Sequence, residues 1–382
     1  MRRKSMLVLA IGLIFFAQAA QADWTANKRL TWTSSYTYHP AIVIDPSYYL
    51  HVVWDDFTPG NWEIYYKRST NGGTDWTANK RLTWSSTGSA YPAIAIDQSQ
   101  NIQVVYEDHQ PGPWQIYHKR STNGGGAWSA AKRLTWTTGQ ALLPALAVDS
   151  SGVLHMVWQD DVSGNSEIYY KQSNDEGETW TVSKRLTWNS GTSSSPALAV
   201  DSSDNLHLVW SDGSSGSVEI CYRKSEDGGT TWTTSKRLTW MTSIEIAPKI
   251  SVDSSDNPHV VWENPLPGNG DIYYKMSIDG GTTWGVNQRL TWSSGTAHEP
   301  SIGIALSGKI WMVWKDTAPG NSELYYRNST DGGANWSLSQ RITQTAGDSR
   351  DQAFAINSVG ELNLVWADDT PGNYELYFKK GN

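Results

Sequence analysis

The tetrapeptide Arg-Leu-Thr-Trp recurs at a fixed interval, and this repeat is the strongest constraint on the fold of the chain. Its first copy begins at Arg29, and related segments begin at Arg81, Arg133, Arg185, Arg237, Arg289 and Arg341. The interval is 52 residues in every case, without insertion or deletion. A chain with such a period is built from copies of one supersecondary unit, and each copy buries its apolar faces against its neighbours.

The N-terminal segment has the features of a secretory signal peptide. Residues 2–4 are basic, residues 6–17 are mostly apolar, and Ala20-Gln21-Ala22 is typical of a cleavage site. The apolar run is shorter than a membrane span requires, and no other run of spanning length follows it. The sequence therefore predicts cleavage after Ala22, a secreted or periplasmic protein without a membrane span, and a single domain over residues 23–382.

The charge of the predicted mature chain argues against nucleic acid as a partner. Without the three basic residues of the leader, 27 basic and 38 acidic side chains give a net charge of −11. Such a surface repels a phosphate backbone. Cys221 is the only cysteine, so no intrachain disulfide can form, and the packing of 22 tryptophans and 18 tyrosines must supply the stability.

Each period contains four strand-like runs, separated by turns rich in Gly, Asn, Asp, Ser and Pro. In the first period these runs are residues 40–45, 50–54, 63–67 and 76–84, which we call runs A to D. Runs A and B are apolar almost throughout, as strands covered on both faces are, whereas run D is more polar and fits an outer edge. A four-stranded meander of this repeat length predicts a β-propeller.

The two ends of the chain predict how the ring closes. The predicted mature chain begins with a D run at residues 24–32 and stops after a C run at residues 375–379. With an A run near 352–357 and a B run near 362–366, the N-terminal run completes the last blade. We therefore expect an all-β, seven-bladed propeller of four-stranded antiparallel blades, closed by its N-terminal strand so that no blade edge stays exposed.

The turn between runs C and D carries the pattern Ser-x-Asp/Asn-x-Gly-x-x-Trp in six copies, of which Ser225–Trp232 is one. The Asp or Asn caps the turn, the Gly adopts a positive φ, and the Trp returns to the core. This pattern resembles the Asp-box (BNR) repeat of sialidase-like β-propellers, and the resemblance covers essentially the whole predicted mature chain. It implies that the motif is structural and lies on the face away from the ligand site. The structural Asp-box residues are Asn71, Asn123, Asp175, Asp227, Asp279 and Asp331.

The resemblance does not carry a sialidase activity over to this chain. A sialidase needs three arginines around the substrate carboxylate, a Tyr/Glu nucleophile pair and an Asp acid. Here nearly every arginine belongs to an Arg-Leu-Thr segment or to the end of a C run, and only Arg350 lies in a D–A loop. The Phe/Tyr-Arg-Ile-Pro motif of many sialidases is also missing. We assign no catalytic residue and favour a protein that is not an enzyme.

A metal or a cofactor is not expected either. The Asp-box hairpin offers too few oxygens for the roughly six to eight ligands of calcium. The histidines of the B runs come one per blade, so they are too dispersed to share a metal and are expected in the core. These are His51, His155, His207 and His259.

Candidate ligand-binding residues are expected on the face formed by the D–A and B–C loops. The D–A loops are where the repeats diverge, and they supply Tyr38, His39 and Arg350. Tryptophans end the D runs at Trp32, Trp84, Trp136, Trp188, Trp240 and Trp292. Aspartates follow the B runs at Asp56, Asp108, Asp160, Asp212, Asp316 and Asp368. Such carboxylates suit the acid–base chemistry of a glycosidase, but a carboxylate repeated in nearly every blade is equally explained by turn capping.

The sequence thus favours a secreted, non-catalytic propeller that recognises carbohydrate, as a lectin does, or an extracellular protein. Aromatic rings beside carboxylates suit sugars, which offer apolar faces and hydroxyl groups, and repeated weak sites gain from multivalency. The alternatives are a sialidase-like glycoside hydrolase and a structural or assembly module.

Overall fold

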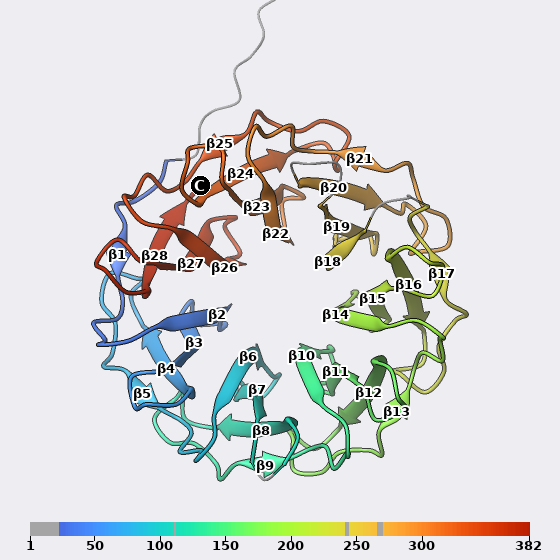
Figure 1. Ribbon diagram of the computed structural model, residues 1–382, viewed down its shortest axis with the longest axis horizontal. Helices are drawn as coiled ribbons and strands as arrows, with labels where there is room; N and C mark the ends of the chain where they lie inside the picture. Colours follow the sequence, from blue (N-terminus) through green and yellow to red (C-terminus); the bar gives the residue numbers. More distant parts are fainter. Residues whose placement is uncertain (1–22, 111, 241–243, 266–269) are drawn as a thin grey trace, which may run out of the picture.

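The computed structural model describes residues 23–110, 112–240, 244–265 and 270–382. The predicted signal peptide, residues 1–22, lies outside the described residues. The regular structure of the described residues consists of β-strands, in seven four-stranded antiparallel sheets arranged around a central axis (Figure 1). The structure confirms the predicted all-β, seven-bladed propeller.

Every blade presents its strands in the same order from the axis outward. The innermost strands are β2 (Thr37–Ile44), β6 (Ser89–Ile96), β10 (Ala141–Val148), β14 (Ser193–Val200), β18 (Ile246–Val252), β22 (Ala297–Ile304) and β26 (Ser349–Ile356). The second strands are β3 (Leu50–Asp56), β7 (Ile102–Asp108), β11 (Leu154–Asp160), β15 (Leu206–Asp212), β19 (Pro258–Asn264), β23 (Ile310–Asp316) and β27 (Leu362–Asp368). The third strands are β4 (Glu63–Ser69), β8 (Gln115–Ser121), β12 (Glu167–Ser173), β16 (Glu219–Ser225), β20 (Asp271–Met276), β24 (Glu323–Ser329) and β28 (Glu375–Gly381).

The outermost strands are much shorter than the predicted D runs. They are β5 (Lys80–Arg81), β9 (Lys132–Arg133), β13 (Lys184–Arg185), β17 (Lys236–Arg237), β21 (Gln288–Arg289), β25 (Gln340–Arg341) and β1 (Lys28–Arg29). The prediction of a strand over residues 76–84 is therefore wrong in extent. Threonine hydroxyls take the place of backbone carbonyls, because Ile64 N donates to Thr83 Oγ1 at 2.8 Å and Arg68 N donates to Thr77 Oγ1 at 3.1 Å. The chain still runs beside β4, but as an irregular edge.

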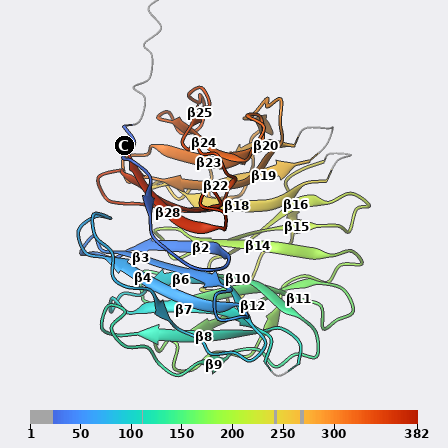
Figure 2. The same ribbon diagram turned by 60° about the vertical axis from the view of Figure 1, so that its left-hand side comes forward.

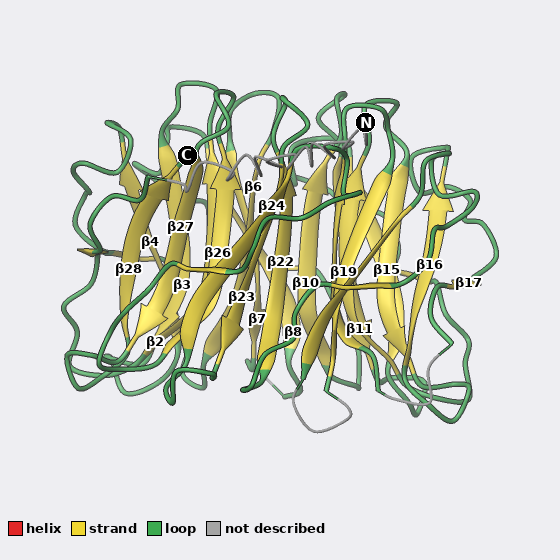
Figure 3. Ribbon diagram, turned by 90° about the horizontal axis from the view of Figure 1, so that it is seen from above, coloured by secondary structure: helices red, strands yellow, loops and turns green. Residues whose placement is uncertain are grey.

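We number the blades from 1, formed by β2 to β5, to 7, formed by β26 to β28 together with β1. In blade 7 the N-terminal β1 pairs with β28, with Lys28 opposite Phe378 and Arg29 opposite Tyr377. This pairing confirms the predicted ring closure. Figure 2 shows the blades side by side, and Figure 3 shows the strands running between two rims of loops. None of the described residues forms a helix long and apolar enough to cross a membrane.

The hydrophobic core is divided among the contacts between neighbouring blades. Trp54 and Val52 of blade 1 pack against Leu376 and Phe378 of blade 7, whereas Val53 faces the other way and packs against blade 2. The second strands are therefore apolar on both faces, as the sequence pattern predicted. The tryptophans two residues before the ends of these strands are 0–1% exposed: Trp54, Trp158, Trp210, Trp262, Trp314 and Trp366.

Hydrogen bonds within the Asp-box turns hold their conformation. Ser225 Oγ donates to Asp227 Oδ1 and accepts from Gly229 N at 2.8 Å, while Asp227 Oδ1 accepts from Thr231 N at 2.7 Å. Equivalent bonds hold the turns of Asn71, Asn123, Asp175, Asp279 and Asp331. The turn also contacts the preceding blade, because Tyr170 of blade 3 donates to the carbonyl of Gly228 in blade 4. The motif therefore joins blades as well as strands.

Most arginines of the repeated Arg-Leu-Thr segment neutralise a buried carboxylate of the third strand. Arg81 Nη2 lies 2.7 Å from Glu63 Oε1, and the Glu63 side chain is fully buried. The same pair forms in blades 3 to 7 with Glu167, Glu219, Asp271, Glu323 and Glu375. Blade 2 has a neutral Gln115 in the position of Glu63.

This difference gives a matched test of the ion pair. Replacing Arg81 by alanine should lower the free energy of unfolding by about 2 kcal/mol, because Glu63 stays buried without its partner and keeps only part of its hydrogen bonding. Replacing Arg133 by alanine in blade 2 should cost less than about 1 kcal/mol, because the neutral Gln115 there leaves no buried carboxylate without an ion-pair partner. Denaturant unfolding of both variants measures the difference, and equal losses would contradict this role of the arginine.

Candidate functional site

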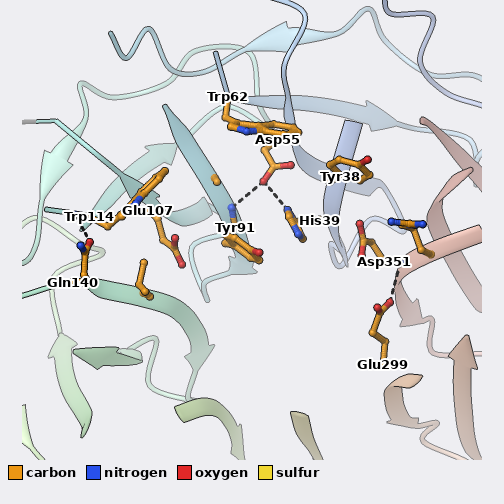
Figure 4. Close-up of a pocket in the computed structure, with 13 residues that line it drawn as sticks. Tyr38, His39, Asp55, Trp62, Tyr91, Glu107, Trp114, Gln140, Glu299 and Asp351 are labelled. Atoms are coloured by element: carbon orange, nitrogen blue, oxygen red, sulfur yellow. Dashed lines mark hydrogen bonds and ion pairs between the residues drawn. The ribbon is translucent and has the colours of Figure 1, made fainter. Parts of the chain in front are cut away.

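A cavity of about 740 Å³ opens on the face formed by the D–A and B–C loops (Figure 4). Its walls come from the starts of the innermost strands, the ends of the second strands and the B–C loops. The lining residues are Tyr38, His39, Asp55, Trp62, Ala90, Tyr91, Glu107, Trp114, Gln140, Leu142, Glu299, Arg350 and Asp351. They belong to blades 6, 7, 1, 2 and 3, so the cavity lies toward one side of the ring.

The sevenfold symmetry of the blades is broken at this cavity. At the register of Trp62, the blades carry in turn Trp62, Trp114, Ser166, Val218, Gly270, Ser322 and Tyr374. Aromatic rings therefore stand at this register only in the consecutive blades 7, 1 and 2. At the register of Tyr38, one step into the innermost strand, the residues are Tyr38, Ala90, Leu142, Ser194, Ile246, His298 and Arg350. The identical scaffold thus carries one chemically distinct sector.

A β-bulge near the start of each innermost strand shapes this sector. In blade 1 the register with β3 shifts between Tyr38 and Ala41. One residue per bulge has a left-handed φ of 46–53°, which costs non-glycine residues energy. These residues are His39, Tyr91, Leu143, Ser195, Ala247, Glu299 and Asp351. Four of them, His39, Tyr91, Glu299 and Asp351, line the cavity.

Side chains of the second strands hold these bulges from the neighbouring blade. Asp55 Oδ2 accepts from Tyr91 N at 3.1 Å, and Glu107 Oε1 accepts from Leu143 N at 2.5 Å. Asp55 Oδ2 also lies 2.8 Å from His39 Nδ1. Both carboxylates are nearly fully buried, with 1% and 2% of their surface exposed. They therefore fix the cavity wall and at the same time present carboxyl oxygens to it.

Burial and neighbouring charges shift the titration of these groups. Burial raises the pKa of Glu107 to about 8, although its hydrogen bond to Leu143 N and the charge of His39 oppose the shift. Burial also raises the pKa of Asp351. Burial alone would lower the pKa of His39, but the hydrogen bond to Asp55 and the nearby carboxylates raise it overall. At neutral pH the cavity therefore contains a protonated carboxyl group, Glu107, beside the His39–Asp55 pair.

Aromatic rings form the blade 7 and blade 1 side of the site. The Tyr38 ring lies 5.6 Å from the Trp62 ring and 5.0 Å from the Tyr374 ring, measured between centroids. The guanidinium of Arg350 lies 4.4 Å above the Tyr374 ring, and a carboxylate oxygen of Asp348 lies 3.6 Å from its Nη2. Arg350 is thus stacked in place rather than held by a close ion pair.

Two buried polar atoms of the site have no hydrogen-bond partner among the described residues. One is the acceptor Asp55 Oδ1, and the other is the donor Arg350 Nε. A buried polar atom without a partner costs free energy, so both atoms are complementary to a polar ligand.

The raised pKa of Glu107 predicts how stability changes with pH. Between about pH 4.5 and pH 8 the folded protein keeps a proton that the unfolded chain releases, so the free energy of unfolding falls as the pH rises through this window. Glu107→Gln removes this loss and should gain about 2 kcal/mol relative to the parent between pH 5 and pH 8, less than the whole shift because the cavity is open to water. Denaturant unfolding at both pH values measures it. A constant difference between the two proteins would contradict the assignment.

The structure separates the predicted site residues into three groups. Tyr38, His39 and Arg350 line the cavity together. The tryptophans that follow the outermost strands do not line it and are 63–71% exposed: Trp32, Trp84, Trp136, Trp188, Trp240 and Trp292. The aspartates that end the second strands are 1–7% exposed and cap the B–C turns by accepting from the backbone N–H two residues later: Asp56, Asp108, Asp160, Asp212, Asp316 and Asp368.

Sequence reasoning missed Asp55 and Glu107, which directly precede two of the capping aspartates. Trp62 and Trp114 were not among the predicted site residues either, although they lie outside the repeated tryptophan positions. That irregularity was the available signal, since a residue outside the repeat register marks a blade with its own chemistry. The B-run histidines lie in the core, where His51 bridges Tyr66 and Asp45 and its equivalents do the same: His155, His207 and His259.

Comparisons with known proteins agree with this architecture. Residues 19–189 match the profile of the BNR repeat-containing family. A sialidase of Bacteroides fragilis (strain YCH46) is 25% identical over 288 residues, which cover 61% of this chain and 50% of that protein. The chain thus spans half the length of this curated relative.

Several solved structures share the fold at low sequence identity. An ulvan lyase, a polysaccharide lyase bound to -[GlcA(1-4)Rha3S]-, has a TM-score of 0.65 and 11% identity over 94% of this chain and 95% of that one. An α-L-arabinofuranosidase of Fusarium graminearum in complex with arabinobiose has a TM-score of 0.57 and 14% identity over 94% and 97%. A sialidase of Streptococcus pneumoniae has a TM-score of 0.53 and 14% identity over 92% and 70%.

The seven blades and the repeated Asp-box turns define a sialidase-like β-propeller. The chain carries Asp-box (BNR) repeats, and residues 19–189 are similar to the BNR repeat-containing family.

Proposed function

We propose that the protein recognises carbohydrate in the cavity lined by blades 6, 7, 1, 2 and 3. The observation that carries this proposal is that one aromatic-lined cavity contains both an acceptor without a partner, Asp55 Oδ1, and a donor without a partner, Arg350 Nε. A hydroxyl group can serve either atom, and a sugar combines many hydroxyls with apolar ring faces that suit Trp62 and Trp114. Solved structures of the same fold bear the names of enzymes that act on saccharides, which supports the choice.

The ligand is a saccharide other than sialic acid. Arg350 is the one arginine among the described residues that line the cavity, and the carboxyl groups of Asp55, Glu299 and Asp351 line it as well. A cavity of this composition cannot form the three-arginine clamp that a sialic acid carboxylate requires. In keeping with the predicted leader, the protein functions outside the cytoplasm, in the periplasm or the medium. The site belongs to a single propeller domain of residues 23–382.

A glycan array followed by calorimetry tests this proposal. The full chain without its leader should bind at least one class of neutral oligosaccharide with 1:1 stoichiometry, and sialylated glycans should not compete. The absence of any bound saccharide on the array would contradict carbohydrate recognition. Binding that requires a terminal sialic acid would contradict the assignment of the ligand class.

A second candidate function is cleavage of the bound saccharide, and the titration of Glu107 favours it. A carboxyl group that stays protonated at neutral pH can donate a proton to a leaving oxygen, and the His39–Asp55 pair nearby offers a base. If the protein is an enzyme, release of new sugar ends should be lost in Glu107→Gln while binding persists. Binding without release of sugar ends by the parent protein would leave recognition as the function.

A further inference from the structure

Six exposed tryptophans follow the outermost strands of six of the seven blades. We call them the rim tryptophans, where the rim is the outer circumference of the ring: Trp32, Trp84, Trp136, Trp188, Trp240 and Trp292. Each follows an outermost strand by the same three residues, in the consecutive blades 7 and 1 to 5. The outermost strands lie at the periphery of the ring in Figure 1. With 63–71% of each side chain exposed, a large part of each ring is open to solvent.

A cation lies beside the ring of every rim tryptophan. In all six blades, the guanidinium of the repeated arginine lies 5.5–5.9 Å from the ring centroid. The same arginine is fixed by donating to the carbonyl two residues later, at 2.6–2.8 Å. Four rings also have a lysine or arginine of the next blade within 6.0 Å: Lys171, Arg223, Lys275 and Arg327. Cation–π attraction therefore favours the same ring position in each of these blades.

Blade 6 indicates that the fold does not need these tryptophans. Gln344 takes their position there. The rest of the local structure is unchanged, because Arg341 still pairs with Glu323 and Thr343 Oγ1 still accepts from Leu324 N at 2.8 Å. An exposed aromatic ring is unfavourable in water, and blade 6 folds without one. The presence of this ring in the other six blades therefore points to a role in binding.

We propose that the rim tryptophans are equivalent, individually weak sites for the sugar rings of a neutral polysaccharide. A ligand with a repeating unit matches a surface with a repeating ring, and a single exposed indole among charged groups suits a sugar with one apolar face and a hydroxylated edge. A lipid surface favours a continuous apolar patch, whereas cations separate these rings. The net charge of −11 after removal of the three basic leader residues disfavours a polyanion.

Linked weak sites should give a long polymer an affinity that a short oligosaccharide cannot reach. The rim sites are separate from the cavity, so this proposal does not depend on what the cavity binds. Short oligosaccharides report on the cavity, and long polymers report on the rim.

Native electrophoresis through gels that contain xylan, mixed-linkage β-glucan or arabinan tests the proposal. The matched variant replaces all six rim tryptophans by glutamine, the residue that blade 6 already carries, and its melting temperature and near-ultraviolet circular dichroism establish that it folds. We expect at least one of the three polymers to retard the parent protein. Its apparent affinity should fall at least tenfold in the sixfold variant and by an intermediate factor when only three rings are replaced.

The control is Trp62→Ala/Trp114→Ala, which alters the cavity and leaves the rim intact. It should keep the retardation by polymer even where it loses the binding of tetrasaccharides. Three results would overturn the proposal: no retardation of the parent protein, equal retardation of the sixfold variant, or rim-dependent flotation with phosphatidylcholine vesicles in place of retardation. Loss of tetrasaccharide binding in the cavity variant alone bears only on the function proposed for the cavity.

Discussion

Replacing Gly229 by alanine should lower the free energy of unfolding by about 4 kcal/mol, because overpacking and an unfavourable backbone conformation act together. Gly229 has a φ of 86°, and a Cβ atom at this position would overlap the Tyr170 hydroxyl of the preceding blade. Tyr170 is only 3% exposed and hydrogen-bonds to His155, so it cannot move aside. The substitution therefore disturbs the contact between blades 3 and 4.

The neighbouring glycine provides the control. Gly228 also has a positive φ, of 63°, but a Cβ atom there meets no atom within 4 Å. Gly228→Ala should therefore cost only about 1 kcal/mol, the penalty of the left-handed backbone. Guanidinium unfolding of the two variants measures the difference. Similar losses would mean that the Asp-box turn does not lock neighbouring blades together.

Replacing Arg350 by alanine should weaken oligosaccharide binding about 100-fold, which corresponds to about 2.7 kcal/mol. The Arg350 guanidinium carries the unpartnered donor of the cavity and is preorganised over Tyr374. Its loss leaves a ligand hydroxyl without its partner and also opens the aromatic wall. Isothermal titration calorimetry with the best saccharide of the array gives the affinity.

Arg120→Ala is the matched control, because Arg120 lies on the Asp-box face and pairs with Glu176 and Glu178. It should bind as the parent does. Arg350→Lys should recover only part of the affinity, because a lysine keeps the charge but loses the planar stacking. Unchanged binding by Arg350→Ala would place the ligand outside this cavity.

The architecture was predictable because one repeat of the sequence corresponds to one blade. A period without insertions requires equivalent blades, and the missing strand of the last blade is the surplus strand at the N-terminus. The length of the outermost strand was not predictable from apolar patterning. There the hydroxyls of Thr77 and Thr83 accept hydrogen bonds in place of backbone carbonyls, and the hydropathy of the segment does not reveal this.

The candidate site was predictable only in part, because it depends on contacts between blades. Asp55 and Asp56 are adjacent, and side chains alternate along a strand, so Asp56 caps its own turn while Asp55 faces the cavity. The partner of Asp55 is the backbone of Tyr91 in the next blade, which no pattern within one repeat reveals. Divergence among the D–A loops pointed to Tyr38, His39 and Arg350, which the structure places in one cavity. It could not show that the other half of the site comes from the second strands and the B–C loops.

A crystal structure of the protein with a bound oligosaccharide tests the central claim most directly. We expect a sugar ring in the cavity, stacked on Trp62 or Trp114, with hydroxyls within hydrogen-bond distance of Asp55 Oδ1 and Arg350 Nε. An oligosaccharide that leaves this cavity empty and binds instead on the opposite face, beside the Asp-box turns, would contradict it.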